Sequence, residues 1–161
     1  MVVYQSCLNT PIGLLEIVGS KHAIHAIRFD AVKYTEADNL PPILIKCRTE
    51  LEEYFAGKRK HFTVNAEQGG TDFQKLVWKK IAEIPFGKTI SYLEVARMTG
   101  DEKATRAVGN ANGKNKIPIL IPCHRVIGSN DSLTGYAGGL WRKQWLLEHE
   151  HSIIHGIRKL F

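Results

Sequence analysis

The sequence predicts an α/β protein of two domains: a small antiparallel sheet with one helix, then a mostly helical half that contains a helix-turn-helix. Three apolar segments separated by turn signals fill the first 30 residues, which is typical of a strand meander. Helix-start signals at Thr71 and Ser91 mark the second half. The segment 61–70 is interpreted as the linker, and we place the domains at residues 1–66 and 67–161.

The first half is expected to form three strands and one helix. The strand segments are rich in Val, Ile, Leu and Tyr and cover residues 2–8, 14–18 and 23–29. After a polar loop over residues 30–39, Pro41-Pro42 favour the first turn of a helix that Gly57 ends. One face of that helix is apolar: Leu44, Cys47, Leu51 and Tyr54/Phe55. Cys47 is therefore expected in the core.

The second half begins with a capping box, in which the Thr71 hydroxyl and the Gln74 amide satisfy backbone donors of the first turn. The apolar face of this helix is expected to be Phe73, Leu76, Val77 and Ile81. Ser91 and Glu94 repeat the start signal, and Gly100 stops the short helix that follows.

A second short helix is expected over residues 104–112, whose small residues would let it approach another surface closely. Two short helices so spaced outline a helix-turn-helix, in which the second helix usually lies in a DNA groove. Such pairs also occur in many proteins that never meet DNA. Residues 128–139 are then expected to form a loop and residues 140–150 a closing helix, with four apolar residues covering the core: Leu140, Leu147 and Trp141/Trp145. The tail, residues 151–161, could pack back, and we assign it no function.

Composition limits the compartment and the partner. Lys and Arg number 22 against 16 Asp and Glu, a net charge of +6 that suits a polyanion but is weak support by itself. The three cysteines form no CxxC pair, so we expect a reducing compartment without disulfides. No signal-peptide pattern occurs, and no apolar run reaches the roughly 20 residues that span a bilayer. We therefore expect a soluble intracellular protein with no membrane partner.

Cys123 stands in the most informative stretch. An apolar run, residues 117–121, is pinned by Pro118 and Pro122, which predicts a rigid buried segment that delivers Cys123 to a defined place. His124 and Arg125 supply an imidazole and a cation, the usual means of lowering a thiol pKa. Neighbours on an extended backbone point to opposite faces, so His124 would act through water or after a sharp turn. For a Cys-His pair alone, a small core hydrophobe is the commoner role.

Four ordered blocks carry a resemblance to a known family. They are IPFGKTISY at residues 84–92, ATRAVGNA at 104–111, IPILIPCHRVIG at 117–128 and LTGYAGGLWRKQWLLEHE at 133–150. The segment 71–150 thereby resembles the O6-alkylguanine-DNA alkyltransferases, which move an alkyl group from guanine to their own cysteine. The first 66 residues match that family only in length and in the order of their elements.

The resemblance implies an RNase H-like N-terminal domain and a winged-helix-like DNA-binding domain that carries Cys123. The implied activity is DNA repair by irreversible transfer of a methyl or larger alkyl group from O6-alkylguanine, and also O4-alkylthymine, to Cys123 after base flipping. The implied partner is double-stranded DNA containing O6-alkylguanine. We expect a monomer without cofactor, cytoplasmic, or nuclear in a eukaryote.

Several residues match DNA-binding positions of that family. Arg106 matches the finger that replaces the flipped base, and Tyr92 matches the tyrosine that rotates the base. The rest of the expected DNA-binding set is Ala104, Thr105, Ala107, Gly109 and Asn110. Lys143 matches a lysine that tunes the proton of the tyrosine. The alternatives are an ordinary phosphate or solvent contact for Arg106, a half-buried aromatic for Tyr92 and a solvated lysine for Lys143.

The substrate pocket is expected around Tyr136, which matches the aromatic wall on which the base stacks; core packing is the alternative. The backbone amide of Ala137 would face O6, and the carbonyls of Cys123 and Val126 would accept from the exocyclic amine. The Gly138-Gly139 pair would give the loop freedom to approach the base.

The resemblance further implies a relay in which Glu150 orients and charges His124, which acts through water on Cys123, while Asn115 holds the turn. No metal is required. A zinc site made of Cys7, His22, His25 and Cys47 is the alternative, but the spacings match no zinc pattern. Lys116 stands where relatives commonly have Pro, and Asp131 where they have Gly.

Two other functions compete with this one. An alkyltransferase-like binding protein would flip the lesion and recruit repair machinery, but such relatives replace the nucleophile, typically with Trp, whereas this chain keeps Cys123. A Cys-His hydrolase would turn over esters or amides, whereas a suicidal transferase reacts once per molecule.

Overall fold

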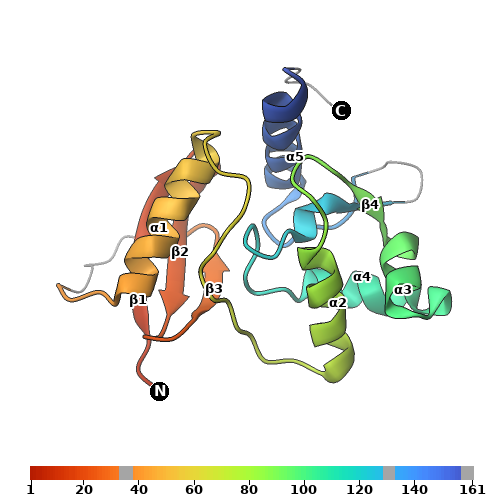
Figure 1. The fold of residues 1–161 in the computed structure, drawn as a ribbon, viewed down its shortest axis with the longest axis horizontal. Helices are drawn as coiled ribbons and strands as arrows, with labels where there is room; N and C mark the ends of the chain where they lie inside the picture. Colours follow the sequence, from red (N-terminus) through yellow and green to blue (C-terminus); the bar gives the residue numbers. More distant parts are fainter. Residues whose placement is uncertain (33–37, 129–132, 157–161) are drawn as a thin grey trace. The chain divides into compact units, whose positions relative to one another are not determined.

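The computed structural model describes residues 1–32, 38–128 and 133–156. The chain divides into two compact units, Met1–Gln68 (unit 1) and Gly69–Phe161 (unit 2), each described by itself below (Figure 1). Asp131 and the end of the tail, residues 157–161, lie outside the described residues. No helix within the described ranges is both long enough and apolar enough to cross a membrane.

Unit 1 is a three-stranded antiparallel sheet in the order β1-β2-β3, with one helix packed on it. The strands are β1 (Tyr4–Thr10), β2 (Gly13–Gly19) and β3 (Ile24–Arg28), and the helix is α1 (Pro42–Phe55). Proline at the first helical position fits the start of α1, because its missing N–H would have no partner there. The predicted meander and helix are confirmed.

The apolar face of α1 is buried as predicted at Leu44, Cys47, Leu51 and Tyr54, each with no exposed surface. The segment 61–70, interpreted above as the linker, is hydrogen-bonded to unit 1 in its middle part. Ile24 donates its N–H to the carbonyl of Asn65 at 2.8 Å, and Glu67 donates to the carbonyl of Ile24 at 2.9 Å. These bonds satisfy backbone groups on the outer edge of β3, which would otherwise need water.

Unit 2 is mostly helical and also contains a pair of very short strands (Figure 1). Its elements are α2 (Asp72–Ala82), β4 (Ile90–Ser91), α3 (Tyr92–Thr99), η1 (Glu102–Ala104), α4 (Thr105–Gly113), η2 (Cys123–Arg125), β5 (Val126–Ile127) and α5 (Leu140–His155). The predicted start signals are confirmed, since Thr71 and Gln74 exchange both capping-box bonds and the Ser91 hydroxyl accepts from the Glu94 N–H. Gly100 ends α3 in the left-handed conformation with φ of 97°.

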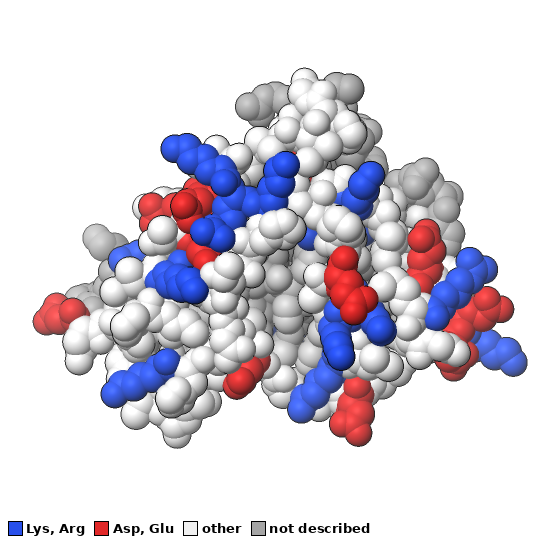
Figure 2. Space-filling view, in the orientation of Figure 1, with Lys and Arg blue, Asp and Glu red and all other residues white. Residues whose placement is uncertain are grey.

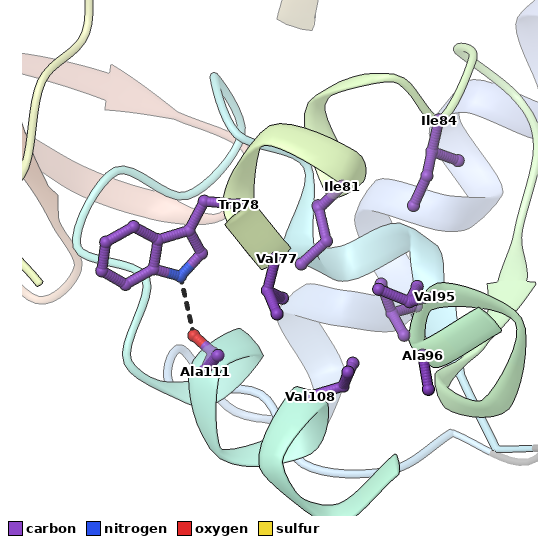
Figure 3. Close-up of a cluster of buried hydrophobic side chains, with 9 residues drawn as sticks. Val77, Trp78, Ile81, Ile84, Val95, Ala96, Val108 and Ala111 are labelled. Atoms are coloured by element: carbon purple, nitrogen blue, oxygen red, sulfur yellow. Dashed lines mark hydrogen bonds between the residues drawn. The ribbon is translucent and has the colours of Figure 1, made fainter. Parts of the chain in front are cut away.

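The core of unit 2 joins α2, α3 and α4, the last two being the helices of the predicted helix-turn-helix (Figure 3). Val77 and Ile81 of α2 are buried as expected, but Leu76 is 37% exposed. Trp78 lies on the buried face, where its indole N–H donates to the carbonyl of Ala111 at 2.8 Å. The buried face of α2 therefore includes Trp78 and not Leu76.

The last helix, α5, differs most from expectation. It continues to His155, and its first apolar residues, Leu140 and Trp141, are about half exposed and do not cover the core as predicted. Leu147 is buried as expected, together with Leu146 and three charged residues: Arg142, Lys143 and Glu150. Polar side chains can occupy a buried helix face only where partners meet them, so these three residues mark the site.

Candidate active site

The run before Cys123 forms a tight buried turn. The Ile121 N–H donates to the carbonyl of Ile117 at 3.0 Å. Ile119 has a φ of 75°, which is a genuine outlier for a β-branched side chain, and it is almost completely buried. Cys123 then begins the short η2 helix, so the sharp-turn alternative holds and the backbone is not extended at Cys123 and His124.

The side chains of two asparagines that precede this turn in the sequence form hydrogen bonds with its backbone. The Asn115 amide donates to the carbonyl of Ile121 at 2.9 Å, and its oxygen accepts from the N–H of Ile117 at 3.1 Å. The Asn112 amide donates to the carbonyl of Cys123 at 3.3 Å. Both asparagines are buried. Hydrogen bonds from the two asparagines to the carbonyls on either side of Pro122 thus fix the backbone position of Cys123.

A buried carboxylate lies at the centre of the charged cluster. Glu150 accepts from His124 Nε2 at 2.7 Å and from Arg125 through two bonds of 2.8 and 3.0 Å. The Gly87 N–H donates to the same carboxylate at 3.1 Å. Burial raises the pKa of Glu150, but His124 and Arg125 outweigh burial and hold this pKa far below its ordinary value. Glu150 is therefore ionised throughout the neutral range.

The ionised carboxylate determines the tautomer of His124. A carboxylate without a proton can only accept, so Nε2 of His124 carries the hydrogen and Nδ1 keeps a lone pair. Within the described ranges Nδ1 has no hydrogen-bond partner. Burial lowers the pKa of His124, although Glu150 acts in the opposite direction. The imidazole is neutral at pH 7 and able to take up a proton at Nδ1.

Cys123 is only 5% exposed, and burial raises its pKa to about 11. A hydrogen bond with Asn115 and the charge of Lys143 oppose this rise. The prediction that Arg125 supplies the cation for the thiol is wrong, because its guanidinium binds Glu150 and donates to the carbonyl of Ile84 at 2.7 Å. The thiol is protonated at neutral pH, so its reaction requires a base.

Lys143 is completely buried and replaces Arg125 as the cation near the thiol. Its ammonium donates to the carbonyls of Val126 at 2.7 Å and Thr134 at 2.6 Å, and lies 6.0 Å from the ring centre of Tyr92. Burial lowers the pKa of Lys143 to about 8, and the neighbouring Cys123 opposes this shift. The Thr134 hydroxyl donates to the Tyr92 hydroxyl at 3.2 Å, which links the tyrosine to the lysine.

The loop before α5 carries the expected pocket residues. Tyr136 is half-buried, and burial together with the charge of Cys123 raises its pKa well above the ordinary value. The carbonyl of Gly138 accepts from Arg142 at 2.9 Å, and Ala137 is exposed. The carbonyls of Cys123 and Val126, expected to hold the amine of guanine, already accept from Asn112 and Lys143. A bound amine would share those carbonyls with them.

The outer face of α4 presents a different surface. Arg106, Ala107 and Asn110 are exposed, while three other expected DNA-binding residues are half-buried: Ala104, Thr105 and Gly109. Unit 1 contains eight basic and eight acidic residues, so the net charge of +6 falls entirely in unit 2, with 14 against 8. Basic and acidic side chains are interspersed on the face shown in Figure 2.

Comparison with known proteins identifies the family. The ribonuclease-like domain of 6-O-methylguanine DNA methyltransferase matches residues 3–68, and the DNA binding domain of the same protein matches residues 72–152. A methylated-DNA--protein-cysteine methyltransferase from Methanosarcina acetivorans is 41% identical over 157 residues, covering 93% of this chain and 99% of the relative. The chain belongs to the 6-O-methylguanine DNA methyltransferase family.

Other members of the family agree in sequence and fold. The constitutive enzyme of that name from Bacillus subtilis is 42% identical over 144 residues, covering 84% of this chain and 87% of the relative. The crystal structure of Mycobacterium tuberculosis O6-methylguanine methyltransferase has a TM-score of 0.84 at 41% identity and covers 94% of both chains. A structure of M. tuberculosis OGT in complex with DNA has a TM-score of 0.82 at 42% identity, with 91% and 92% coverage.

For a methyltransferase of this family, sequence reasoning missed three features of the site: the pairing of Arg125 with Glu150, the bond from Asn112 and the link through Thr134. A signal existed for Arg125, because an arginine within a buried apolar segment needs a carboxylate or several carbonyls as partners. Nothing in the sequence distinguishes Asn112 from a solvent-facing helical asparagine.

The alternative zinc site finds no support in the geometry of the described residues. Within the described ranges no group of three or more His, Cys, Asp or Glu side chains is placed to hold a metal ion. Both ring nitrogens of His25 are already engaged, by the carbonyl of Glu67 and the hydroxyl of Ser20. Cys47 lies on the buried face of α1 and has no exposed surface.

Proposed function

We propose that this chain repairs DNA by transferring a methyl or larger alkyl group irreversibly from O6 of guanine, and also from O4 of thymine, to Sγ of Cys123. The observation that carries the proposal is the buried Cys123 turn beside a neutral His124 whose Nε2 is held by the Glu150–Arg125 ion pair. Family membership supplies the reaction class.

Activation of the thiol is the first step. With a pKa of about 11, Cys123 cannot ionise alone at pH 7, so its proton passes to Nδ1 of His124, directly or through a water. The resulting imidazolium is stabilised by Glu150 at 2.7 Å, which stays ionised and does not take the proton itself. Arg125 holds the carboxylate in place and keeps it from being protonated.

Alkyl transfer then follows as a displacement. The sulfur forms a bond to the alkyl carbon, the bond from that carbon to O6 breaks, and its electron pair stays on guanine. Guanine takes up one proton, which balances the proton lost by Cys123. We propose that the Tyr92 hydroxyl donates this proton to guanine. Tyr92 lies close to Lys143 and is hydrogen-bonded to Thr134. The sulfur–carbon bond is stable, so each molecule reacts once.

Access to O6 requires the base to leave the duplex stack, at a cost of a few kcal/mol that is lower for a damaged pair. We place Arg106, exposed near the start of α4, in the gap left by the flipped base. Ala107 and Asn110 share the exposed face of α4, and small side chains there let the helix lie close to the groove. The DNA complex of an M. tuberculosis relative supports DNA as the partner.

The assembly and compartment follow from the chemistry. Cys7, Cys47 and Cys123 are all free thiols, and a reaction that uses Cys123 requires a reducing environment, so we place the protein in the cytoplasm. The proposed site uses residues of one chain, and we expect the protein to act as a monomer on double-stranded DNA.

Intact mass after incubation with duplex DNA containing O6-methylguanine tests the proposal. We expect a gain of one methylene equivalent per molecule, confined to Cys123 by peptide mapping, and no gain in Cys123→Ala. An unchanged mass in folded wild-type protein that still binds the lesion would contradict the transfer and favour a recruiting factor.

A further inference from the structure

We propose that Asn112 is a positioning residue that couples the outward face of α4 to the backbone of Cys123. The proposal rests on the function proposed above and concerns how DNA contacts reach the nucleophile. Asn112 is 4% exposed, and its amide donates to the carbonyl of Cys123 at 3.3 Å.

The two faces of α4 have different tasks. Arg106, Ala107 and Asn110 point to solvent, whereas Val108 and Ala111 join the hydrophobic core. Asn112 continues the buried face at the end of the helix, where an apolar residue would be expected. One rigid helix therefore carries the expected DNA contacts on one side and a hydrogen bond to the nucleophile on the other.

The end of α4 is anchored twice. Trp78 of α2 donates to the carbonyl of Ala111 at 2.8 Å, as Figure 3 shows, and the next residue, Asn112, reaches Cys123. Just after the helix, Asn115 donates to the carbonyl of Ile121. Asn112 and Asn115 thus bind the carbonyls of Cys123 and Ile121, respectively. A displacement of the end of α4 would therefore change the position of Cys123.

Packing alone does not account for an asparagine here. Within the described ranges the oxygen Oδ1 of Asn112 has no partner, and a buried amide with an unsatisfied oxygen is less favourable than an apolar side chain of similar volume. The amide hydrogen bond to Cys123 is the gain that offsets this cost. A misplacement of a reacting group by about 1 Å can lower the reaction rate about a hundredfold. Loss of a hydrogen bond that positions Cys123 can therefore have a large effect on the rate.

The test compares two substrates in two variants. Asn112→Leu keeps the branched shape and the number of heavy atoms of the side chain, and Asn112→Ala does not, but both remove the donor. For each protein, second-order rate constants are measured on duplex DNA containing O6-methylguanine and on free O6-benzylguanine, together with the melting temperature. We expect the ratio of the duplex rate to the free-base rate to fall about tenfold in both variants, so that the duplex rate is lost well beyond any loss of the free-base rate.

Asn65→Ala is the matched control, because its amide also donates to a backbone carbonyl, that of His22 at 3.1 Å, in unit 1. The ratio should not change in this variant. Adding Arg106→Ala to Asn112→Leu should lower the ratio by less than the product of the single effects, since both changes interrupt one path.

Equal slowing on both substrates, or a loss that follows the melting temperature, would overturn the coupling and leave Asn112 a structural residue. Wild-type protein that alkylates Cys123 but shows an unchanged ratio in the variants overturns the coupling alone. Wild-type protein unreactive toward both substrates overturns the proposed function as well.

Discussion

The two units each bury a cysteine and a glutamate, and their comparison supports our proposal that only one of the two thiols is the nucleophile. Cys47 is completely buried on α1, where burial and the charge of Glu50 raise its pKa to about 12. Cys123 is also buried, with a pKa of about 11. Both thiol pKa values are raised, so the pKa alone does not distinguish Cys123 from Cys47. The difference lies in the groups around each thiol.

The glutamates differ in what holds them. Glu50 accepts from the backbone and hydroxyl of Thr63 and pairs with Arg59 at 3.6 Å, so its partners supply no base. Glu150 is bound by His124, whose second nitrogen keeps a lone pair. Under the proposed function, His124 is the base that removes the proton of Cys123, and Glu50 holds no such base.

The largest expected effect separates the two cysteines. Cys123→Ala should abolish alkyl transfer completely, whereas Cys47→Ala should retain stoichiometric transfer and lose stability through the cavity under α1. Intact mass after reaction with methylated DNA and the melting temperature of each variant measure both effects. Loss of transfer in a folded Cys47→Ala protein would end the distinction between the two thiols.

The next effect concerns the carboxylate that holds the base. Glu150→Gln should slow transfer about a hundredfold, because imidazolium loses its stabilising charge, and should raise the apparent pKa of Cys123. Lesion binding should be nearly intact. His124→Ala should cost at least as much, and the double variant much less than the product, because a relay fails as a unit.

Thiol reactivity of wild type and Glu150→Gln across pH, with melting temperatures as control, provides the measurement. Identical pH profiles in the two proteins would rule out the relay.

A smaller effect is expected at the buried cation. Lys143→Met keeps most of the unbranched side chain but removes the charge that favours the thiolate, so the pKa of Cys123 should rise above about 11. Transfer should slow about tenfold at pH 7. The rate of Cys123 modification by a small thiol reagent as a function of pH tests this, with the exposed Lys21→Met as control. A pKa that falls or stays constant would show that Lys143 acts elsewhere.

The smallest effect on transfer is expected at Glu50. Glu50→Gln should leave the transfer rate unchanged and cost about 1–3 kcal/mol of stability at pH 7, because charged hydrogen bonds to Thr63 are lost. Burial raises the pKa of Glu50, but Thr63 and Arg59 hold it below its ordinary value. Stability from ionised Glu50 is therefore present above about pH 4.3 and is lost as pH falls through the folded pKa.

Urea unfolding of wild type and Glu50→Gln at pH 7 and pH 3 should show a difference that narrows in acid. A difference that grows in acid would mean that the pKa of Glu50 is raised in the folded protein.

Local sequence chemistry determined most elements. Capping residues such as Thr71, Ser91 and Gly100 mark helix ends through their own hydrogen bonds and dihedral angles, so short-range patterns identify them without knowledge of the fold. The apolar stripe of α1 is equally local. The order of four motif blocks was sufficient to indicate the family and to nominate Cys123, His124 and Glu150 as neighbours in space.

Only the tertiary structure decided how the charged residues pair. Arg125 and Glu150 are 25 positions apart in sequence, and which buried cation meets the thiol depends on how α5 packs beside the Cys123 turn. The same packing leaves Leu140 and Trp141 exposed and buries Lys143, against the hydrophobic pattern. Patterns report the average preference of a side chain for water, whereas a buried charge is stabilised by particular partners that distant segments bring to it.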